Sequence, residues 1–176
     1  MTSLHIKAMQ DRARRYPGDA AVLGLDFGTV TGWAIRHAGG NLDCGQKRFE
    51  KRGGAGFRFL KFRAWLTETK NSAGGFEAVY YERVDFASTT EQSRTIFGFE
   101  ATLGAWCEHH RIAYAGLPVA TIKKFWTGSG RADKPQMVAT AREMGFDLCP
   151  RDHNAADALA VLHLGLERME QANGKA

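Results

Sequence analysis

Hydrophobic and polar residues follow two different periods along this chain, and together they predict a domain built of both strands and helices. Short apolar runs, bounded by turns that contain glycine, predict five strands. These lie at residues 21–27, 31–37, 42–50, 77–84 and 111–117. Apolar residues spaced three and four apart predict helices instead. The helices are expected at residues 57–70, in a long segment between 84 and 111, and at 119–126, 135–144 and 154–169.

The order of these elements predicts how they are layered. Three consecutive strands joined by tight turns, one of them at Gly39-Gly40-Asn41, predict an antiparallel meander. The last two strands alternate with helices, which favours parallel pairing. We therefore expect one α/β domain over residues 21–170, with a five-stranded mixed sheet flanked by helices and the first and fourth strands side by side. Residues 171–176 are expected to form a flexible tail.

The first twenty residues are polar and basic, with Lys7, Arg12, Arg14 and Arg15 ahead of Pro17. This pattern has two interpretations: a loosely held basic arm, or a short helix that ends at the proline.

Composition and charge limit the partners and the cellular location that we expect for this chain. The net charge of +5 and the pI of about 9.3 suit a polyanionic partner, although this alone is weak support. The chain has no run of about 18 apolar residues, so no membrane span is expected, and its first residues do not resemble a secretory signal. Three cysteines without a CxxC spacing favour free thiols over a zinc site, and with them a cytoplasmic location.

Three acidic residues stand where they could converge. Asp26 ends the first strand, Glu82 lies near the end of the fourth, and Asp157 is expected in the first turn of the last helix. Clustered carboxylates repel one another unless a hard cation such as Mg²⁺ binds between them. Each residue also has a structural alternative: a turn aspartate, a salt bridge at a strand end, or a helix cap.

The last alternative is specific. Asn154-Ala155-Ala156-Asp157 has the form of a capping box, with Asn154 as N-cap. The positive end of the helix dipole would then help to keep Asp157 ionised.

A second candidate site is the loop at residues 127–136. Its small residues would allow a ligand to approach the backbone, and Arg131 and Lys134 supply positive charge. Lys123 and Lys124 are expected on the same face, so the group is a candidate contact for DNA phosphates. The alternative is an ordinary loop with solvated charges.

Two further features have both a binding and a structural interpretation. Phe86 follows Glu82 closely and could stack on an unpaired base, or it could be an ordinary packed aromatic. Arg52, Arg58, Lys61 and Arg63 could face DNA, but a solvated helix face accounts for them better.

Several motifs together resemble one known family. They are Leu23-Gly24-Leu25-Asp26-x-Gly-Thr, Glu82-Arg83-Val84, Ile122-Lys123-Lys124, the loop Gly128-Ser129-Gly130-x-Ala132-Asp133-Lys134, and Ala155-Ala156-Asp157-Ala158-Leu159-Ala160. In this order, over about residues 21–166, they resemble the RuvC-type Holliday junction resolvases, which have an RNase H-like fold.

This resemblance implies an endonuclease that binds four-way DNA junctions as a homodimer and hydrolyses paired phosphodiester bonds. It implies two Mg²⁺ or Mn²⁺ ions held by Asp26, Glu82 and Asp157. Lys134 would act near the scissile phosphate, and Lys123 would be a weaker DNA contact.

The chain departs from the family pattern at one ligand. Asn154 stands where the family usually has Asp or His as a fourth ligand, and Asp152 or His153 could substitute for it. Such differences suggest a divergent branch, of phage or prophage origin. They leave three alternatives: a broader nuclease for branched DNA or RNA, a catalytically impaired junction-binding protein, and an actin-like nucleotide-binding module, which rests on Asp26-x-Gly-Thr alone.

Overall fold

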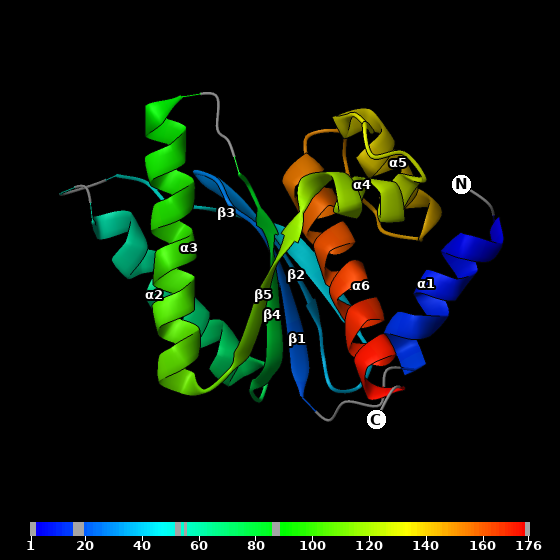
Figure 1. Ribbon diagram of the computed structural model, residues 1–176, viewed down its shortest axis with the longest axis horizontal. Coiled ribbons are helices and arrows are strands. Elements are labelled where there is room, and N and C mark those ends of the chain that lie inside the picture. The colour runs from blue at the N-terminus through cyan, green and yellow to red at the C-terminus, as the bar shows by residue number, and fades with distance from the viewer. Residues whose placement is uncertain (1–2, 16–19, 52–53, 55, 86–88, 175–176) are drawn as a thin grey trace.

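The computed structural model describes residues 3–15, 20–51, 54, 56–85 and 89–174 (Figure 1). Its sheet contains β1 (Ala21–Asp26), β2 (Val30–Arg36), β3 (Leu42–Arg48), β4 (Phe76–Arg83) and β5 (Ala113–Pro118). Its helices are α1 (Ser3–Arg15), α2 (Phe57–Ser72), α3 (Thr90–His110), α4 (Val119–Thr127), α5 (Lys134–Glu143) and α6 (His153–Asn173).

The sheet confirms the predicted fold class. Its strand order is β3-β2-β1-β4-β5. The pairs β1–β2 and β2–β3 are antiparallel, while β4 runs parallel to both β1 and β5. The first and fourth strands are therefore neighbours, and the carboxyl ends of β1, β4 and β5 meet at one edge of the sheet, at the top of Figure 1.

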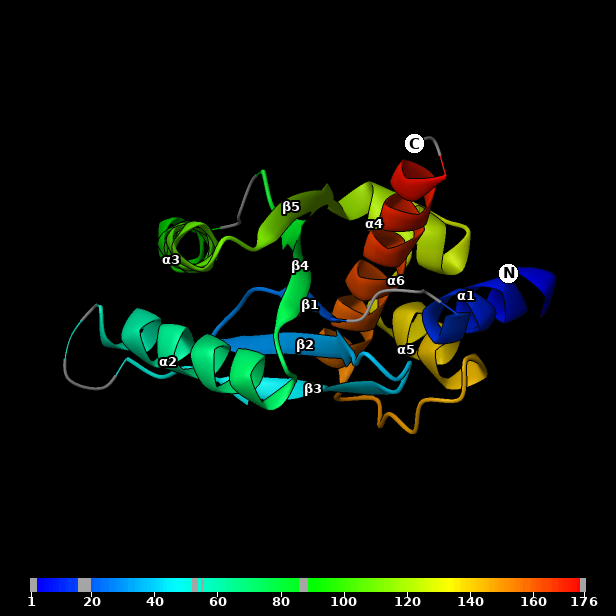
Figure 2. The ribbon, with the colours of Figure 1, turned by 90° about the horizontal axis from the view of Figure 1, so that it is seen from below.

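Helices cover both faces of this sheet (Figure 2). Successive side chains of a strand point to opposite faces, so each strand contributes to two cores. Leu23 packs with Phe62 and Phe99 under α2 and α3, whereas its neighbour Val22 packs with Leu159 on the side of α6. α4 and α5 lie on the same side of the sheet as α6 (Figure 1). The start of α6 and the loop at residues 127–136 therefore lie near the carboxyl edge.

Two glycines bring α6 close to the sheet. A Cβ on Gly24 would lie 2.7 Å from the carbonyl oxygen of Ala158, and a Cβ on Gly32 only 1.8 Å from that of Asn154. Side chains at these positions would push the helix away. Because neither glycine has a side chain, the first turns of α6 can lie close to β1 and β2.

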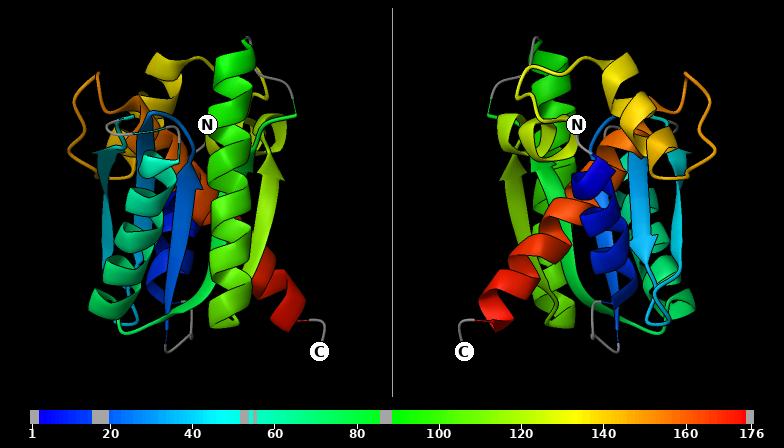
Figure 3. Two further views of the ribbon diagram at one scale, coloured as in Figure 1. Left: turned by 90° about the vertical axis from the view of Figure 1, so that its left-hand side faces the viewer. Right: turned by 90° about the vertical axis from the view of Figure 1, so that its right-hand side faces the viewer.

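The basic N-terminal segment includes a helix, the second of its two interpretations. α1 lies against α6 (Figures 1 and 3), with Met9 buried. His5 Nε2 lies 2.9 Å from the carbonyl oxygen of Phe125, and Gln10 Nε2 donates to that of Met144. Arg12 forms ion pairs with Glu167 and Glu170 of α6. These contacts tie α1 to the three helices that follow β5.

At the other end of the chain, α6 continues to Asn173. Residues 171–173, predicted as part of a flexible tail, are helical. Among the described residues, no helix combines the length and the apolar character needed to cross a membrane.

Candidate active site

Asp26 and Glu82 lie at equivalent positions on two adjacent parallel strands. β1 and β4 pair in a register that places Leu25 beside Tyr81, and each acidic residue comes one position later. Because residues two apart share a face, Asp26 lies on the same face as Gly24, and Glu82 on the same face as Tyr80. Gly24 lies beneath α6, and a Cβ on Gly165 of that helix would lie only 2.3 Å from the ring of Tyr80. Both carboxylates are thus on the α6 face of the sheet.

Asp157 is on the helix that covers this face. Asn154 lies over Gly32, which pairs with Asp26, and Ala158 lies over Gly24. Residues three and four apart share one side of a helix, so Asp157 is on the sheet-facing side. The structure therefore brings together the three carboxylates that the sequence predicted from separate elements.

Burial raises the pKa of all three carboxyl groups, and neighbouring carboxylates add to the rise for two of them. Burial, followed by the charges of Glu82 and Asp157, raises the pKa of Asp26 well above its usual value. Burial and then Asp157 raise the pKa of Glu82 to about 7. Burial raises the pKa of Asp157 to about 6, although Lys123 and Lys134 oppose this rise.

The expected place of Asp157 in the first turn of the last helix is wrong. α6 begins at His153, so Asp157 is in its second turn, and the first turn holds no acidic residue. Burial outweighs the distant helix terminus because the dipole effect fades beyond the first turn.

The capping-box interpretation of Asn154 is also wrong. Asp152 is at the N-cap position, and no side-chain hydrogen bond caps the helix. Asn154 instead donates from Nδ2 to the carbonyl oxygen of Val30, at 2.9 Å. Its helix begins earlier than predicted because residues 149–152 form their own turn, in which Asp152 accepts from the backbone N–H of Cys149.

Of the two proposed substitutes for Asn154, Asp152 is already engaged. It accepts hydrogen bonds from the backbone of Cys149 and the side chain of Gln46, and both lower its pKa, the bond from Cys149 more. His153 is partly buried, and its pKa is lowered by burial and then by Lys134. His153 and Asp157 are four residues apart and so share one side of α6.

The predicted basic residues divide into two groups. Lys123 and Lys134 are near enough to the carboxylates to lower the pKa of Asp157, and Lys134 also acts on Asp26. Lys124 and Arg131 are exposed on the same α4–α5 segment. The predicted cap of α5 is confirmed as a capping box between Asp133 and Gln136, with Lys134 as the first residue of the helix. Phe86 is outside the described residues.

The donor chemistry of this cluster suits a hard divalent cation. Three carboxylates share a buried region, in which Glu82 and Asp157 disfavour ionisation of Asp26 and Asp157 disfavours ionisation of Glu82, while Lys123 and Lys134 partly offset the negative charge. Within residues 3–15, 20–51, 54, 56–85 and 89–174, no three His, Cys, Asp or Glu side chains stand close enough to hold one ion as they are oriented.

Gly24 and Gly32, which allow α6 to approach the carboxylates, were not predicted from the sequence as part of the site. A signal for them existed, since a glycine inside a strand often marks a place where another backbone comes close. Arg58 was assigned to a solvated helix face, but it is buried, with 5% of its surface exposed.

The sheet order, the helices on both faces and the acidic carboxyl edge define an RNase H-like domain. Within that class the chain is most usefully compared with RuvC proteins, to which it is similar in sequence and fold. No protein-family model matches it, but it is 28% identical over 158 residues to the crossover junction endodeoxyribonuclease RuvC of Synechococcus sp. strain WH7803, covering 82% of this chain and 96% of that protein. A shorter match to RuvC of Leifsonia xyli subsp. xyli is 41% identical over 90 residues, 48% of this chain and 41% of that protein.

Solved structures agree on the fold. Thermus thermophilus RuvC, in complex with a Holliday junction substrate, matches with a TM-score of 0.70 at 20% identity, over 86% of this chain and 96% of that one. The yeast mitochondrial Holliday junction resolvase Ydc2 matches with a TM-score of 0.62 at 13% identity, over 96% and 95% of the two chains. These matches confirm the five-stranded mixed sheet predicted from the sequence.

Proposed function

We propose that this chain is a metal-dependent endodeoxyribonuclease that resolves four-way DNA junctions. The observation that carries the proposal is the meeting of Asp26, Glu82 and Asp157 on one face of a RuvC-like sheet, where burial raises the pKa of all three. The curated relatives are named as crossover junction endodeoxyribonucleases, and one similar structure contains a Holliday junction. A basic chain of net charge +5 is suited to this substrate.

In this proposal, Asp26, Glu82 and Asp157 hold Mg²⁺ or Mn²⁺, two ions in all, and Asn154 contributes its amide oxygen. When bound, such ions activate water for attack on phosphorus and stabilise the departing oxygen. The protein must first release protons from its carboxylates, because burial holds their pKa values high.

Lys123 and Lys134 have different neighbours and therefore different proposed roles. Lys134, at the start of α5, faces Asp26 and Asp157 and would contact the phosphate that is cleaved. Lys123 is near Glu82 and Asp157 and would contact the DNA strand beside the cleaved phosphate. Lys124, Arg131 and Phe86 are proposed as outer DNA contacts.

The resemblance also implies a homodimer acting in the cytoplasm. Two simultaneous cuts on opposing strands need two active sites, and the described residues of one chain bring together one such group of three carboxylates. Leu60 of α2 and Phe97 of α3 are large apolar residues that are exposed on the helices of one face. Light scattering at micromolar concentration tests this: a mass twice 19.4 kDa supports the dimer.

A substrate panel tests the proposed specificity. Labelled four-way junction, linear duplex, flap and RNA hairpin of matched length are incubated with Mg²⁺, with Mn²⁺ and with EDTA. Cleavage of the junction alone, abolished by EDTA, is expected. Equal cleavage of flaps or RNA would support the broader nuclease instead, an alternative that the named relatives do not favour. Tight junction binding without cleavage would indicate an impaired centre.

A further inference from the structure

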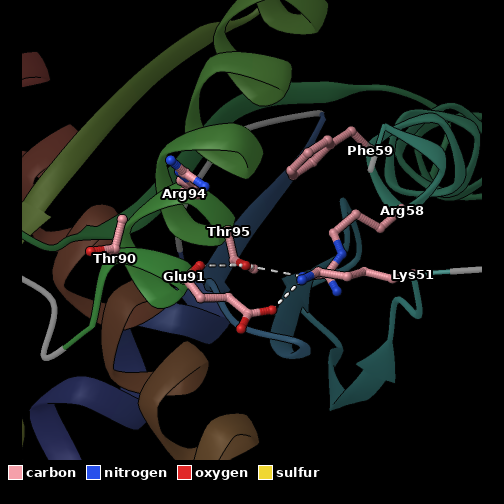
Figure 4. Close-up of a pocket in the computed structure, with 7 residues that line it drawn as sticks. All are labelled: Lys51, Arg58, Phe59, Thr90, Glu91, Arg94 and Thr95. Carbon is pink, nitrogen blue, oxygen red and sulfur yellow. Dashed lines mark hydrogen bonds and ion pairs between the residues drawn. The ribbon is translucent and has the colours of Figure 1, made fainter. Parts of the chain in front are cut away.

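A second basic site lies on the opposite helical layer from α6. A pocket of about 430 Å³ separates the first turns of α2 and α3 (Figure 4). Its lining comes from the segment after β3 and from both helices: Lys51, Arg58, Phe59, Thr90, Glu91, Arg94 and Thr95. Three of these seven side chains are cationic and one is acidic. The pocket therefore presents a net positive charge of 3 − 1 = +2.

Arg58 is the unusual member of this lining. Only 5% of its surface is exposed, and Nη1 donates to Thr95 Oγ1 at 3.1 Å. Its Nε is buried and has no hydrogen-bond partner within the part of the chain that the structure describes. A buried charged group with an unused donor is costly, and an anion in the pocket beside the guanidinium group would relieve part of that cost.

The surrounding groups also favour an anion. Thr90 begins α3, and the first turn of this 21-residue helix carries the positive end of its dipole, although Thr89 Oγ1 already accepts from the backbone N–H of Gln92. Arg94 is exposed one turn further along, on the pocket wall. Glu91 forms an ion pair with Lys51 and is an exposed residue, so an incoming anion could replace it as the partner of Lys51.

The position of the pocket connects it to the proposed active site. β3 runs parallel to β1, so the segment that contains Lys51 leaves the sheet at the carboxyl edge where Asp26 and Glu82 lie. α3 begins after the loop that follows β4, at the same edge (Figure 1). A nucleic acid that crosses this edge would meet Lys123 and Lys134 on one side of the sheet and this pocket on the other.

We propose that the pocket binds a phosphate group, and that in the working protein this is a backbone phosphodiester of the branched DNA. Arg58, Arg94 and Lys51 supply the positive charge, with the first turn of α3 beside them. The identity of the DNA rests on the proposed function, whereas the preference for phosphate rests on the pocket alone.

The first experiment measures the pocket without DNA. Thermal unfolding of the full chain is followed in inorganic phosphate and in sodium chloride of equal ionic strength. Phosphate at five to ten times its Kd is expected to raise Tm by about 2–4 °C in the wild type and not in Arg58→Met. Without phosphate, Arg58→Met should unfold at or above the wild-type temperature, since it removes a buried and incompletely paired charge. Equal protection of both proteins by phosphate would overturn the proposal.

The second experiment identifies the source of the phosphate. Junction affinity is measured from 50 to 300 mM salt for wild type, Arg94→Gln and Arg63→Gln. Arg63 is an exposed residue of α2 outside the pocket lining and is the matched control for charge. Loss of one phosphate contact lowers the slope of log K against log salt by about 0.9 and weakens binding about tenfold. We expect this for Arg94→Gln only.

The two experiments separate this inference from the proposed function. Protection by phosphate with an unchanged salt slope in Arg94→Gln would mean that the pocket takes free phosphate, which overturns the DNA assignment. Normal junction cleavage with no effect in either experiment would overturn the pocket and leave the nuclease standing. Phosphate protection without any junction binding by the wild type would overturn the nuclease and support the anion site.

Discussion

Asn154 Nδ2 donates a hydrogen bond to the carbonyl oxygen of Val30, which lies 2.9 Å away and 124 residues earlier in the chain. This bond fastens the first turn of α6 to the start of β2, beside the glycine that lets the helix approach. An amide can donate to a carbonyl, whereas a carboxylate cannot. The residue that departs from the family pattern therefore has a structural role at the edge of the carboxylate cluster.

The first prediction concerns Asn154→Asp. The new carboxylate would face the Val30 carbonyl without a proton to donate, and it would add negative charge near Asp26 and Asp157. We expect the metal-free protein to lose about 1–2 kcal/mol of unfolding free energy at pH 8. Mn²⁺ should restore more stability to this variant than to the wild type. Urea unfolding with and without the metal measures both, and equal stabilisation of the two proteins by Mn²⁺ would argue against a ligand position at residue 154.

A second prediction follows from the raised carboxyl pKa values. In the unfolded chain Asp157 and Glu82 titrate near 3.8 and 4.5, but in the folded chain near about 6 and about 7. The folded state therefore holds more protons between these values, and metal-free stability falls as the pH rises from about 4 to about 7. Asp157→Asn should reduce this fall and be more stable than the wild type at pH 8 in EDTA.

Chemical denaturation at pH 5 and pH 8 in EDTA measures this effect. A variant that is less stable than the wild type at pH 8 would show that Asp157 is paired favourably without metal. The same titration predicts that cleavage rises with pH through about 6–7, because the ligands must lose their protons before metal binds.

The third prediction tests the approach of α6 to the sheet. A methyl group at residue 32 would overlap the backbone of Asn154, and neither backbone can move without disturbing the helix. Gly32→Ala is expected to cost about 1–3 kcal/mol or more. Gly39→Ala is the matched control, because a Cβ at Gly39 meets nothing within 4 Å. Thermal unfolding of the two variants compares them, and equal Tm values would contradict the close contact.

The fourth prediction compares two adjacent lysines on α4. Lys123 is partly buried and acts on Glu82 and Asp157, whereas Lys124 is exposed. Lys123→Ala should reduce junction cleavage about tenfold or more, while Lys124→Ala should mainly weaken binding and reduce its salt dependence. Single-turnover rates at saturating enzyme distinguish the two effects. Equal rates for both variants would show that Lys123 has no special role beside the carboxylates.

The sequence predicted much of this arrangement because strand periodicity and glycine turns are local signals. Asp26 and Glu82 could be placed together from the expected neighbourhood of the first and fourth strands. The start of α6 was missed, since it depends on the turn at Cys149–Asp152 and on the bond to Val30. Arg58 was missed for a related reason: only the packing of α2 against α3 shows that this arginine is enclosed.

The central claim is that Asp26, Glu82 and Asp157 form one metal-dependent cleavage site for DNA junctions. Its most direct test is cleavage of a four-way junction labelled on two opposing strands, by wild type and Asp157→Asn, in Mg²⁺ and in Mn²⁺. We predict paired nicks by the wild type and a loss of about 1000-fold or more in the variant, with junction affinity largely retained. Undiminished paired cleavage by Asp157→Asn would contradict this assignment of the site.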